Sequence, residues 1–386
     1  MFIMSDFVAR TNSHNAEGWL VTTPGIEYFV TEEGGQIAPV TFRMADGSSV
    51  EPYHLTPWQD EDKTGLSGAL KNLRGEIFCM PFGGNADPVD GEKHPAHGEC
   101  SGGKWELMSA ENNGVSSTVR FSFSSEIRKS ELVKTVTVNR GESVLYFTHT
   151  VSGSHGSMPL GHHPIIKMPA KGETMLLSVG RFDYGSTCPG VFSNPEKEAY
   201  QLLARGEEFT EIEAVPVLPK DMDTVDYSVF PSPYGFCDLF SVFKKPSDKP
   251  AWVAAVYPDK GYLWYALKDA AVLPSTTFWV SNSGRFFAPW SGRTFCLGVE
   301  DTCSYFADGL KHSVEPNKLN ELGFPTAIRF DPEKPTVIRH IQGVAQVPAD
   351  FGKVADVEFG GRTVTFRDVN GKSVTAAVDY QFVMEK

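Results

Sequence analysis

The segment Glu131–Val151 reads ELVKTVTVNRGESVLYFTHTV and contains two runs rich in β-branched and aromatic residues. Valine, threonine, tyrosine and phenylalanine are favoured in strands. The runs are separated by Asn139–Glu142, a short loop with a glycine, which is typical of a hairpin. The segment therefore predicts two antiparallel strands, at 131–138 and 144–151.

The same kind of pattern continues along most of the chain. Apolar residues take every second position of 119–124, which places them on one face of a pleated strand. The 36 Gly and 26 Pro residues allow many chain reversals, whereas a helical pattern is confined to 198–204 and 317–322. Further strands are predicted at 251–257, 261–267, 277–281 and 294–300. The sequence predicts an all-β protein built as a large antiparallel β-sandwich.

The last part of the chain, from about residue 335, is a β-rich tail. Gly360-Gly361 and Asn370-Gly371 separate short alternating runs there, and both are turn signals because a type I′ turn needs positive φ at its two central residues. We expect a main sandwich domain over 1–334 and a β-rich C-terminal extension over 335–386 that packs on it. The alternative is that the tail supplies edge strands of the main body.

Composition limits the possible partners. The chain has 35 Lys and Arg against 48 Asp and Glu, a formal net charge of −13, and no basic stripe offsets it. We therefore expect neither a nucleic-acid partner nor a membrane partner. No secretory signal and no apolar run near the roughly 18 residues of a membrane helix is visible. Six scattered cysteines without a CxxC pair are typical of reduced thiols, so we expect a cytoplasmic protein.

Glu300 is the most informative candidate for chemistry. It ends a predicted strand whose apolar residues point the other way, so it shares a face with the small residues Cys296 and Gly298. A carboxylate beside small residues suits the floor of a ligand pocket, and the alternative is an ordinary solvated strand end or a salt bridge to an arginine such as Arg293. Nearby aromatic residues offer flat faces for a sugar or belong to the core: Trp264, Trp279, Phe287 and Trp290.

Two histidine motifs accompany this glutamate. Pro164 favours extended geometry for His163, and His162 and His163 then face opposite sides of a strand, so they do not line one site. His94 and His97 lie in a loop rich in Pro and Gly, where polar side chains are commonly presented to ligands. Followed by Glu99, they leave a metal site of the cupin kind as an alternative.

Three motifs, in their order and spacing, resemble the galactose mutarotase (aldose 1-epimerase) superfamily: His97-Gly98, Gly161-His162-His163-Pro164 and Leu297-Gly298-Val299-Glu300. The resemblance covers roughly residues 35–310. It implies a galactose mutarotase-like β-sandwich and an isomerase that interconverts the α and β anomers of a sugar.

Site residues follow from the resemblance by position. Glu300 corresponds to the catalytic base and His163 to the general acid, while His97 corresponds to the histidine that holds the sugar ring. Asp238 and Arg74 are implied as further substrate-binding residues. The implied partner is a small-molecule sugar, and the reaction needs no metal, nucleotide or redox cofactor.

The chain also departs from the family pattern. The usual Asn-His-x-Tyr-Phe-Asn-Leu strand is replaced by GHHPIIK over 161–167, and the usual Glu-Pro-Gln by Glu300-Asp301-Thr302. The acid and base types are kept, which suggests a divergent branch of the family, and the changed positions leave the identity of the sugar open. A phosphorylated sugar would need two or more converging cations, for which the candidates are Arg74, Lys167 and Arg285.

Three other functions are consistent with the same residues. The first is a sugar-binding or regulatory protein that kept the pocket but lost catalysis. The second is the cupin-like metalloenzyme, and the third is a polysaccharide lyase or hydrolase on a related sandwich.

Overall fold

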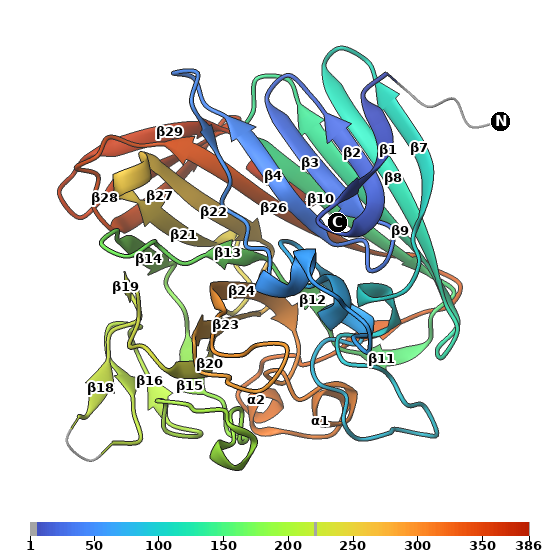
Figure 1. Ribbon diagram of the computed structural model, residues 1–386, viewed down its shortest axis with the longest axis vertical. Helices are drawn as coiled ribbons and strands as arrows, with labels where there is room; N and C mark the ends of the chain where they lie inside the picture. Colours follow the sequence, from blue (N-terminus) through green and yellow to red (C-terminus); the bar gives the residue numbers. More distant parts are fainter. Residues whose placement is uncertain (1–5, 220–221, 386) are drawn as a thin grey trace.

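The computed structural model describes residues 6–219 and 222–385, and its strands pair antiparallel throughout (Figure 1). The described helices are short: α1 (Leu310–Val314), α2 (Lys318–Glu321) and the 3-10 helices η1 (Pro57–Asp60), η2 (Gly68–Asn72), η3 (Glu99–Ser101), η4 (Pro195–Lys197), η5 (Pro258–Lys260) and η6 (Tyr380–Met384). The predicted all-β class is confirmed. Within the described ranges, no helix has the length and apolar character needed to cross a membrane.

A nine-stranded sheet forms the centre of the molecule. Its strands, in spatial order, are β19 (Val229–Phe230), β14 (Met175–Val179), β21 (Ala251–Tyr257), β22 (Tyr262–Lys268), β26 (Thr336–Gln346), β10 (Val144–Ser152), β9 (Ser130–Asn139), β8 (Ser116–Ser125) and β7 (Glu106–Asn112). The hairpin predicted over 131–151 is the β9–β10 pair. The strands predicted at 251–257 and 261–267 are β21 and β22, which pair with each other.

Two further sheets contribute to the core on the inner face of this central sheet. One is five-stranded: β1 (Val8–Ser13), β2 (Ala16–Thr22), β3 (Ile26–Thr31), β4 (Ile37–Arg43) and β5 (Ser49–Val50). The other is eight-stranded: β16 (Glu208–Phe209), β15 (Tyr184–Thr187), β20 (Phe236–Phe243), β23 (Ser275–Asn282), β24 (Phe295–Cys303), β12 (Leu160–His162), β6 (Phe78–Cys79) and β13 (Ile165–Lys167), which pairs with β24. Figure 1 shows β1–β4 lying over β7–β10.

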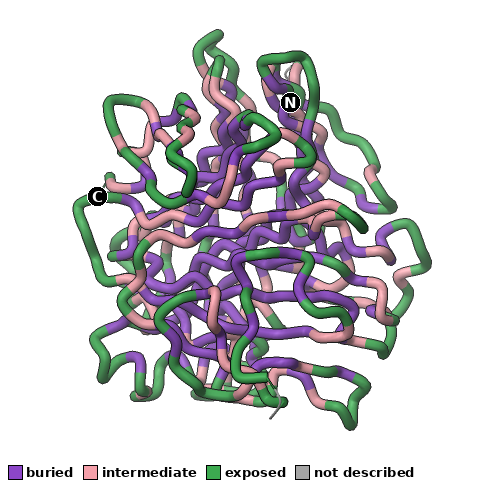
Figure 2. The backbone as a smooth tube through the Cα atoms, turned by 90° about the vertical axis from the view of Figure 1, so that its left-hand side faces the viewer, coloured by how far each residue is buried: buried purple, intermediate pink, exposed green. Residues whose placement is uncertain are grey.

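Strand alternation places apolar residues in the core between these sheets. Val119 and Phe121 of β8 contribute to one buried cluster with Phe278 of β23 and Leu297 of β24. Figure 2 shows buried residues concentrated in the interior and exposed residues in the peripheral loops. Two small two-stranded sheets complete the main body: β11 (Gly156–Met158) with β25 (Ile328–Phe330), and β17 (Val215–Pro216) with β18 (Thr224–Val225).

The C-terminal tail differs from the expected division at residue 335. Its first strand, β26, lies between β10 and β22 in the middle of the nine-stranded sheet, where Ile338 and Val344 are buried on the inner face and Ile341 on the outer face. The following three-stranded sheet and the helix η6 pack on the main body from outside, and the strands of this sheet are β27 (Val354–Gly360), β28 (Thr363–Asp368) and β29 (Ser373–Ala377). The predicted Asn370-Gly371 pair lies in the turn between β28 and β29, whereas Gly360 is the last residue of β27 and the turn before β28 is Gly361-Arg362. Of the four predicted turn residues, Gly361 and Gly371 have positive φ and Gly360 and Asn370 do not, so neither pair has the two positive φ values of a type I′ turn.

Of the two predicted helices, one is present. The segment 317–322 contains α2, whose Asn317 side chain caps the backbone N–H of Asn320. The prediction of a helix at 198–204 is wrong, because the backbone N–H groups of Leu202 and Leu203 donate to the carboxylate of Asp238 instead of to a helical carbonyl. Here the hydrogen bonds to the buried Asp238 carboxylate, which is distant in the sequence, outweigh the local helical pattern.

Candidate active site

A pocket of about 430 Å³ opens on the face of the eight-stranded sheet that is turned away from the central sheet. This volume is in the range typical of small-molecule sites. Its walls come from β12–β13, β20, β23 and β24 and from the loops beside them. The lining residues are Ser67, Gly68, Ala69, Leu70, Leu73, Pro95, Ala96, His97, His163, Phe192, Leu239, Trp279, Arg285, Trp290, Glu300 and Ala307.

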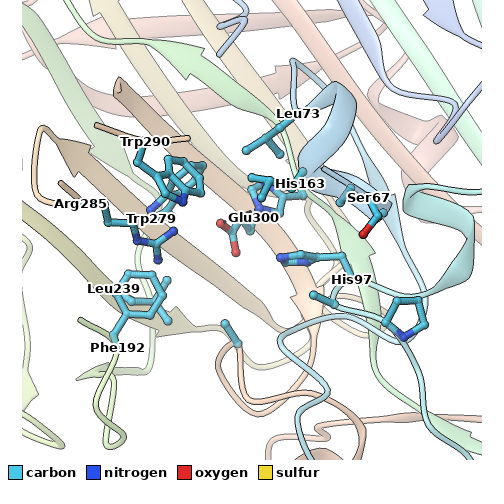
Figure 3. Close-up of a pocket in the computed structure, with 16 residues that line it drawn as sticks. Ser67, Leu73, His97, His163, Phe192, Leu239, Trp279, Arg285, Trp290 and Glu300 are labelled. Atoms are coloured by element: carbon cyan, nitrogen blue, oxygen red, sulfur yellow. Dashed lines mark ion pairs between the residues drawn. The ribbon is translucent and has the colours of Figure 1, made fainter. Parts of the chain in front are cut away.

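Glu300 lies on β24, and its buried side chain points into this pocket (Figure 3). Strand alternation puts it on the same face as Cys296 and Gly298, as predicted. Gly298 leaves the space that the carboxylate occupies, since a Cβ there would lie 2.8 Å from Glu300 Oε1. The alternative pairing with Arg293 is wrong: Arg293 Nη2 donates to Glu61 Oε2 at 2.7 Å.

His163 reaches the pocket from an interruption in the neighbouring strand. Both β12 and β13 pair with β24, but His163 and Pro164 lie between them, and proline has no N–H to donate to a ladder. The His163 N–H donates to Ile77 O at 2.8 Å, and the Val299 N–H donates to Pro164 O at 2.8 Å. As predicted, His162 points to the opposite side, where its Nδ1 lies 2.6 Å from Glu76 Oε1.

The two candidate catalytic side chains are in direct contact. His163 Nε2 lies 3.1 Å from Glu300 Oε1, and both side chains are about 95 % buried or more. Burial raises the pKa of Glu300 well above its ordinary value, which Arg285 partly opposes. Burial, with a contribution from His97, lowers the pKa of His163 well below its ordinary value. Burial therefore favours the neutral forms, whereas the contact itself favours the ion pair.

His97 lies on the other side of His163, with ring centroids 5.1 Å apart in an edge-to-face arrangement. It adopts φ +60° and is followed by Gly98 at φ +77°. A Cβ on Gly98 would lie 1.9 Å from Met80 O, so only glycine fits this turn. Burial and Arg285 lower the pKa of His97 to about 4, which keeps the ring neutral.

Arg285 and three aromatic rings form the opposite wall (Figure 3). The guanidinium carbon lies 4.8 Å from the ring centroid of Trp290, 5.0 Å from that of Phe192 and 5.7 Å from that of Trp279. From the sequence, Arg285 is a candidate only as one of three cations that could bind a phosphate. Phe192 is not predicted from the sequence, because no motif identifies it. Of the predicted aromatic residues, Trp279 and Trp290 line the pocket, Trp264 belongs to the inter-sheet core and Phe287 is exposed.

Arg74 is placed elsewhere, so its assignment to the sugar site needs correction. It is completely buried, and its guanidinium donates to the carbonyl oxygens of Asn72, Ser13 and His14 and to Gln59 Oε1. These partners leave it as a structural residue behind the pocket wall. Lys167, the other cation considered for a phosphate, lies near Glu51 on the surface, so only one of the three candidate cations lines the pocket.

Asp238 also lies outside the pocket. On β20 it alternates with Leu239, which does line the pocket, so the aspartate points to the inter-sheet side. Its Oδ1 accepts from Leu202 N at 2.8 Å and Leu203 N at 3.0 Å, and its Oδ2 accepts from Tyr227 Oη at 2.7 Å. The loose sequence correspondence thus selected Asp238, whereas the pocket-facing residue is its neighbour Leu239.

The residues of the cupin-like alternative do not converge. His94 Nε2 bonds to Glu92 Oε2 at 2.9 Å, and Glu99 Oε2 accepts from Ser125 Oγ and Ile127 N. His97 alone of the three reaches the pocket. Over the described parts of the chain, no group of three or more His, Cys, Asp or Glu side chains is arranged to hold a metal ion.

Comparison with known proteins identifies the fold. No family model matches the sequence, and no curated protein matches it either. Among solved structures, a galactose mutarotase-like protein from Clostridium acetobutylicum superposes with a TM-score of 0.60 at 12% identity, covering 88% of this chain and 98% of its own.

Two further structures match over similar shares. The galactose mutarotase related enzyme from Lactobacillus acidophilus has a TM-score of 0.52 at 13% identity, covering 86% of this chain and 98% of its own. The aldose epimerase homologue from C. elegans has a TM-score of 0.52 at 13% identity, covering 84% of this chain and 96% of its own. The chain therefore has the galactose mutarotase-like β-sandwich fold, at low sequence identity to the structures compared.

Proposed function

We propose that the protein is an aldose 1-epimerase-type isomerase that interconverts the α and β anomers of a sugar. The observation that carries the proposal is the 3.1 Å contact between His163 Nε2 and Glu300 Oε1 in a pocket with aromatic walls. The pocket volume of about 430 Å³ suits one sugar unit, since small-molecule sites start near 300 Å³.

The proposed reaction uses the pair as base and acid. The Glu300 carboxylate removes the proton from the C1 hydroxyl while the His163 imidazolium gives a proton to the ring oxygen, and the C1–O5 bond breaks to leave an aldehyde. Rotation about C1–C2 turns the other aldehyde face toward the O5 hydroxyl. Ring closure then returns the proton from Glu300 to O1 and the O5 proton to His163, so the pair is reset without any other reactant. Each group contributes typically ~10²–10⁴-fold.

The location of the pair suits this chemistry. The anomeric oxygen and the ring oxygen are bonded to the same carbon, so a base and an acid that touch each other can reach both. Burial favours the neutral pair that exists in the ring-opened state, and the direct contact favours the charged pair that starts the reaction. Burial and the direct contact thus act in opposite directions on the protonation of the acid–base pair.

The remaining pocket residues bind the sugar in this proposal. Trp279 and Trp290 offer apolar faces for the C–H side of the ring. His97 and Arg285 direct polar atoms at its hydroxyl groups from opposite walls. Arg285 also opposes the rise in the pKa of Glu300 that burial causes, which favours the ionised form of the base. We place the protein in the cytoplasm, because its six cysteines are all buried and free.

The test is anomer exchange measured by NMR magnetisation transfer over a panel of free and phosphorylated aldoses. We expect the wild type to accelerate exchange for at least one sugar, and Glu300→Gln to abolish it while the sugar still raises the melting temperature. Glu358→Gln is the matched control, since Glu358 lies on β27 and pairs with Arg367 on the surface. If a sugar binds the wild type but its anomers do not exchange faster, the protein is instead a non-catalytic sugar-binding protein.

A further inference from the structure

A buried polar cluster lies directly behind the pocket, between the eight-stranded and nine-stranded sheets. In the antiparallel register of β12 and β24, His162 is paired with Asp301. Because successive side chains alternate, His163 and Glu300 face the pocket while His162 and Asp301 face the space between the sheets. The dipeptides His162-His163 and Glu300-Asp301 thus each carry one residue of the candidate catalytic pair and one residue of the buried cluster.

Asp301 has three partners on this inner side. Its Oδ2 lies 2.7 Å from His340 Nε2, and its Oδ1 lies 2.6 Å from both Lys268 Nζ and Thr276 Oγ1. Burial alone would raise the pKa of Asp301, but Lys268 and the hydrogen bond to His340 outweigh it and lower the pKa. Asp301 is therefore ionised, and the His340 ring must donate through Nε2 because a carboxylate only accepts.

The cluster joins strands that are far apart in the sequence. Gln342 Nε2 lies 2.5 Å from Glu76 Oε2 and 3.3 Å from His340 Nδ1, and the Glu76 carboxyl in turn bonds to His162 Nδ1 at 2.6 Å. The rings of His162 and His340 stack with centroids 4.4 Å apart. From β26 in the nine-stranded sheet, His340 thus reaches Asp301 on β24 directly, and Gln342 reaches His162 on β12 through Glu76.

Stability alone does not account for such a cluster. All its members are at least 97% buried, and replacing a buried ion pair by apolar groups is often neutral or stabilising. Directional hydrogen bonds, in contrast, restrict where a backbone can lie. The backbone ladder is interrupted at His163-Pro164, opposite Glu300, so this is the place where additional restraint on β12 and β24 has an effect.

We propose that Asp301 and His340 are positioning residues, which hold β12 and β24 so that His163 and Glu300 keep their productive contact across the break in the ladder. This inference rests on the proposed isomerase function. Neither residue touches the pocket, so both act only through the strands that carry the catalytic pair. A displacement of about 1 Å at the reacting groups can lower a rate about 10²-fold.

The test compares Asp301→Asn with a matched control, Asp368→Asn. Asp368 is also a buried aspartate, and it accepts from the backbone N–H groups of Gly352, Asn370 and Lys372 in the C-terminal part of the chain. Both variants are expected to lose stability. Only Asp301→Asn is expected to lower kcat, by about 10- to 100-fold, with KM within about twofold of the wild type and with a shifted pH profile. His340→Gln serves as the second, milder variant with the same expected direction.

Two results would overturn the inference. One is a wild-type kcat and pH profile in folded Asp301→Asn. The other is an equal loss of kcat in both aspartate variants, since activity would then follow stability. The side-chain ¹⁵N resonances of His163 add a readout that needs no turnover: they should shift in Asp301→Asn and stay unchanged in Asp368→Asn. If the wild type catalyses no exchange, the proposed function fails while these resonances still test the positioning role.

Discussion

Gly298→Ala tests whether the space beside the Glu300 carboxylate is needed for catalysis. The added Cβ would lie 2.8 Å from Glu300 Oε1 and 3.1 Å from Trp279 Cβ. Ordinary contacts of a Cβ begin at 3.4 Å, so the difference between 3.4 and 2.8 Å forces the carboxylate oxygen back by about 0.6 Å. Trp279 has little room to yield instead, because it is 95% buried and its ring packs 5.7 Å from that of Trp290.

Stability and activity should respond differently to this substitution. Replacing glycine by alanine inside a strand is worth roughly 0.5–1 kcal/mol in favour of folding, and the crowding costs about 1–3 kcal/mol, so the net loss is at most about 2.5 kcal/mol. Displacement of the base should lower kcat by about 10- to 100-fold. Anomer exchange by NMR and thermal unfolding measure the two effects on one sample.

Gly360→Ala is the matched control, because Gly360 ends β27 and a Cβ there meets no heavy atom within 4 Å. It should leave kcat unchanged and should not lower the melting temperature, because the gain of roughly 0.5–1 kcal/mol is not opposed by crowding there. A folded Gly298→Ala protein that exchanges anomers at the wild-type rate would refute the reasoning, since the position of the Glu300 carboxylate would then not limit the reaction.

Four further outcomes are expected. Arg285 opposes the rise in the pKa of Glu300, so Arg285→Met should move the acidic limb of the kcat–pH profile to higher pH, and an unmoved limb would contradict this. Burial lowers the pKa of His54 from 6.5 to about 4, so below pH 6.5 the unfolded chain binds a proton that the folded state does not. As the pH falls from 6.5 to about 4, the wild type therefore loses about 1.4 kcal/mol of unfolding free energy per pH unit through His54. Urea unfolding of His54→Gln should lack this part of the pH dependence. Asp238→Asn should lower the unfolding free energy by about 1–3 kcal/mol without changing KM for the sugar, whereas a changed KM at full stability would return this residue to the binding site. Phe366→Ala should lower the unfolding free energy by about 3–5 kcal/mol, because the ring is fully buried between the C-terminal and central sheets, and an unchanged melting temperature would show that this contact is dispensable.

Local sequence pattern was sufficient for the fold class and for much of the candidate site. The hairpin of β9 and β10 and the strands β23 and β24 follow from side-chain alternation and turn residues, which are properties of neighbouring positions. The opposite directions of His162 and His163 follow from the same rule, as does the shared face of Glu300 and Gly298. A strand period of two needs no knowledge of the rest of the molecule.

Tertiary structure alone decided which face of each strand borders the pocket and which strands become neighbours. Asp238 and Leu239 are adjacent and both buried, yet only Leu239 faces the pocket. The β26 strand reads like the start of a separate tail, yet Gln342 accepts a hydrogen bond from Tyr53 at 2.6 Å across 289 positions. Alternation sorts side chains between two faces but does not say what covers either face. That is determined by packing contacts between residues hundreds of positions apart, which no local pattern records.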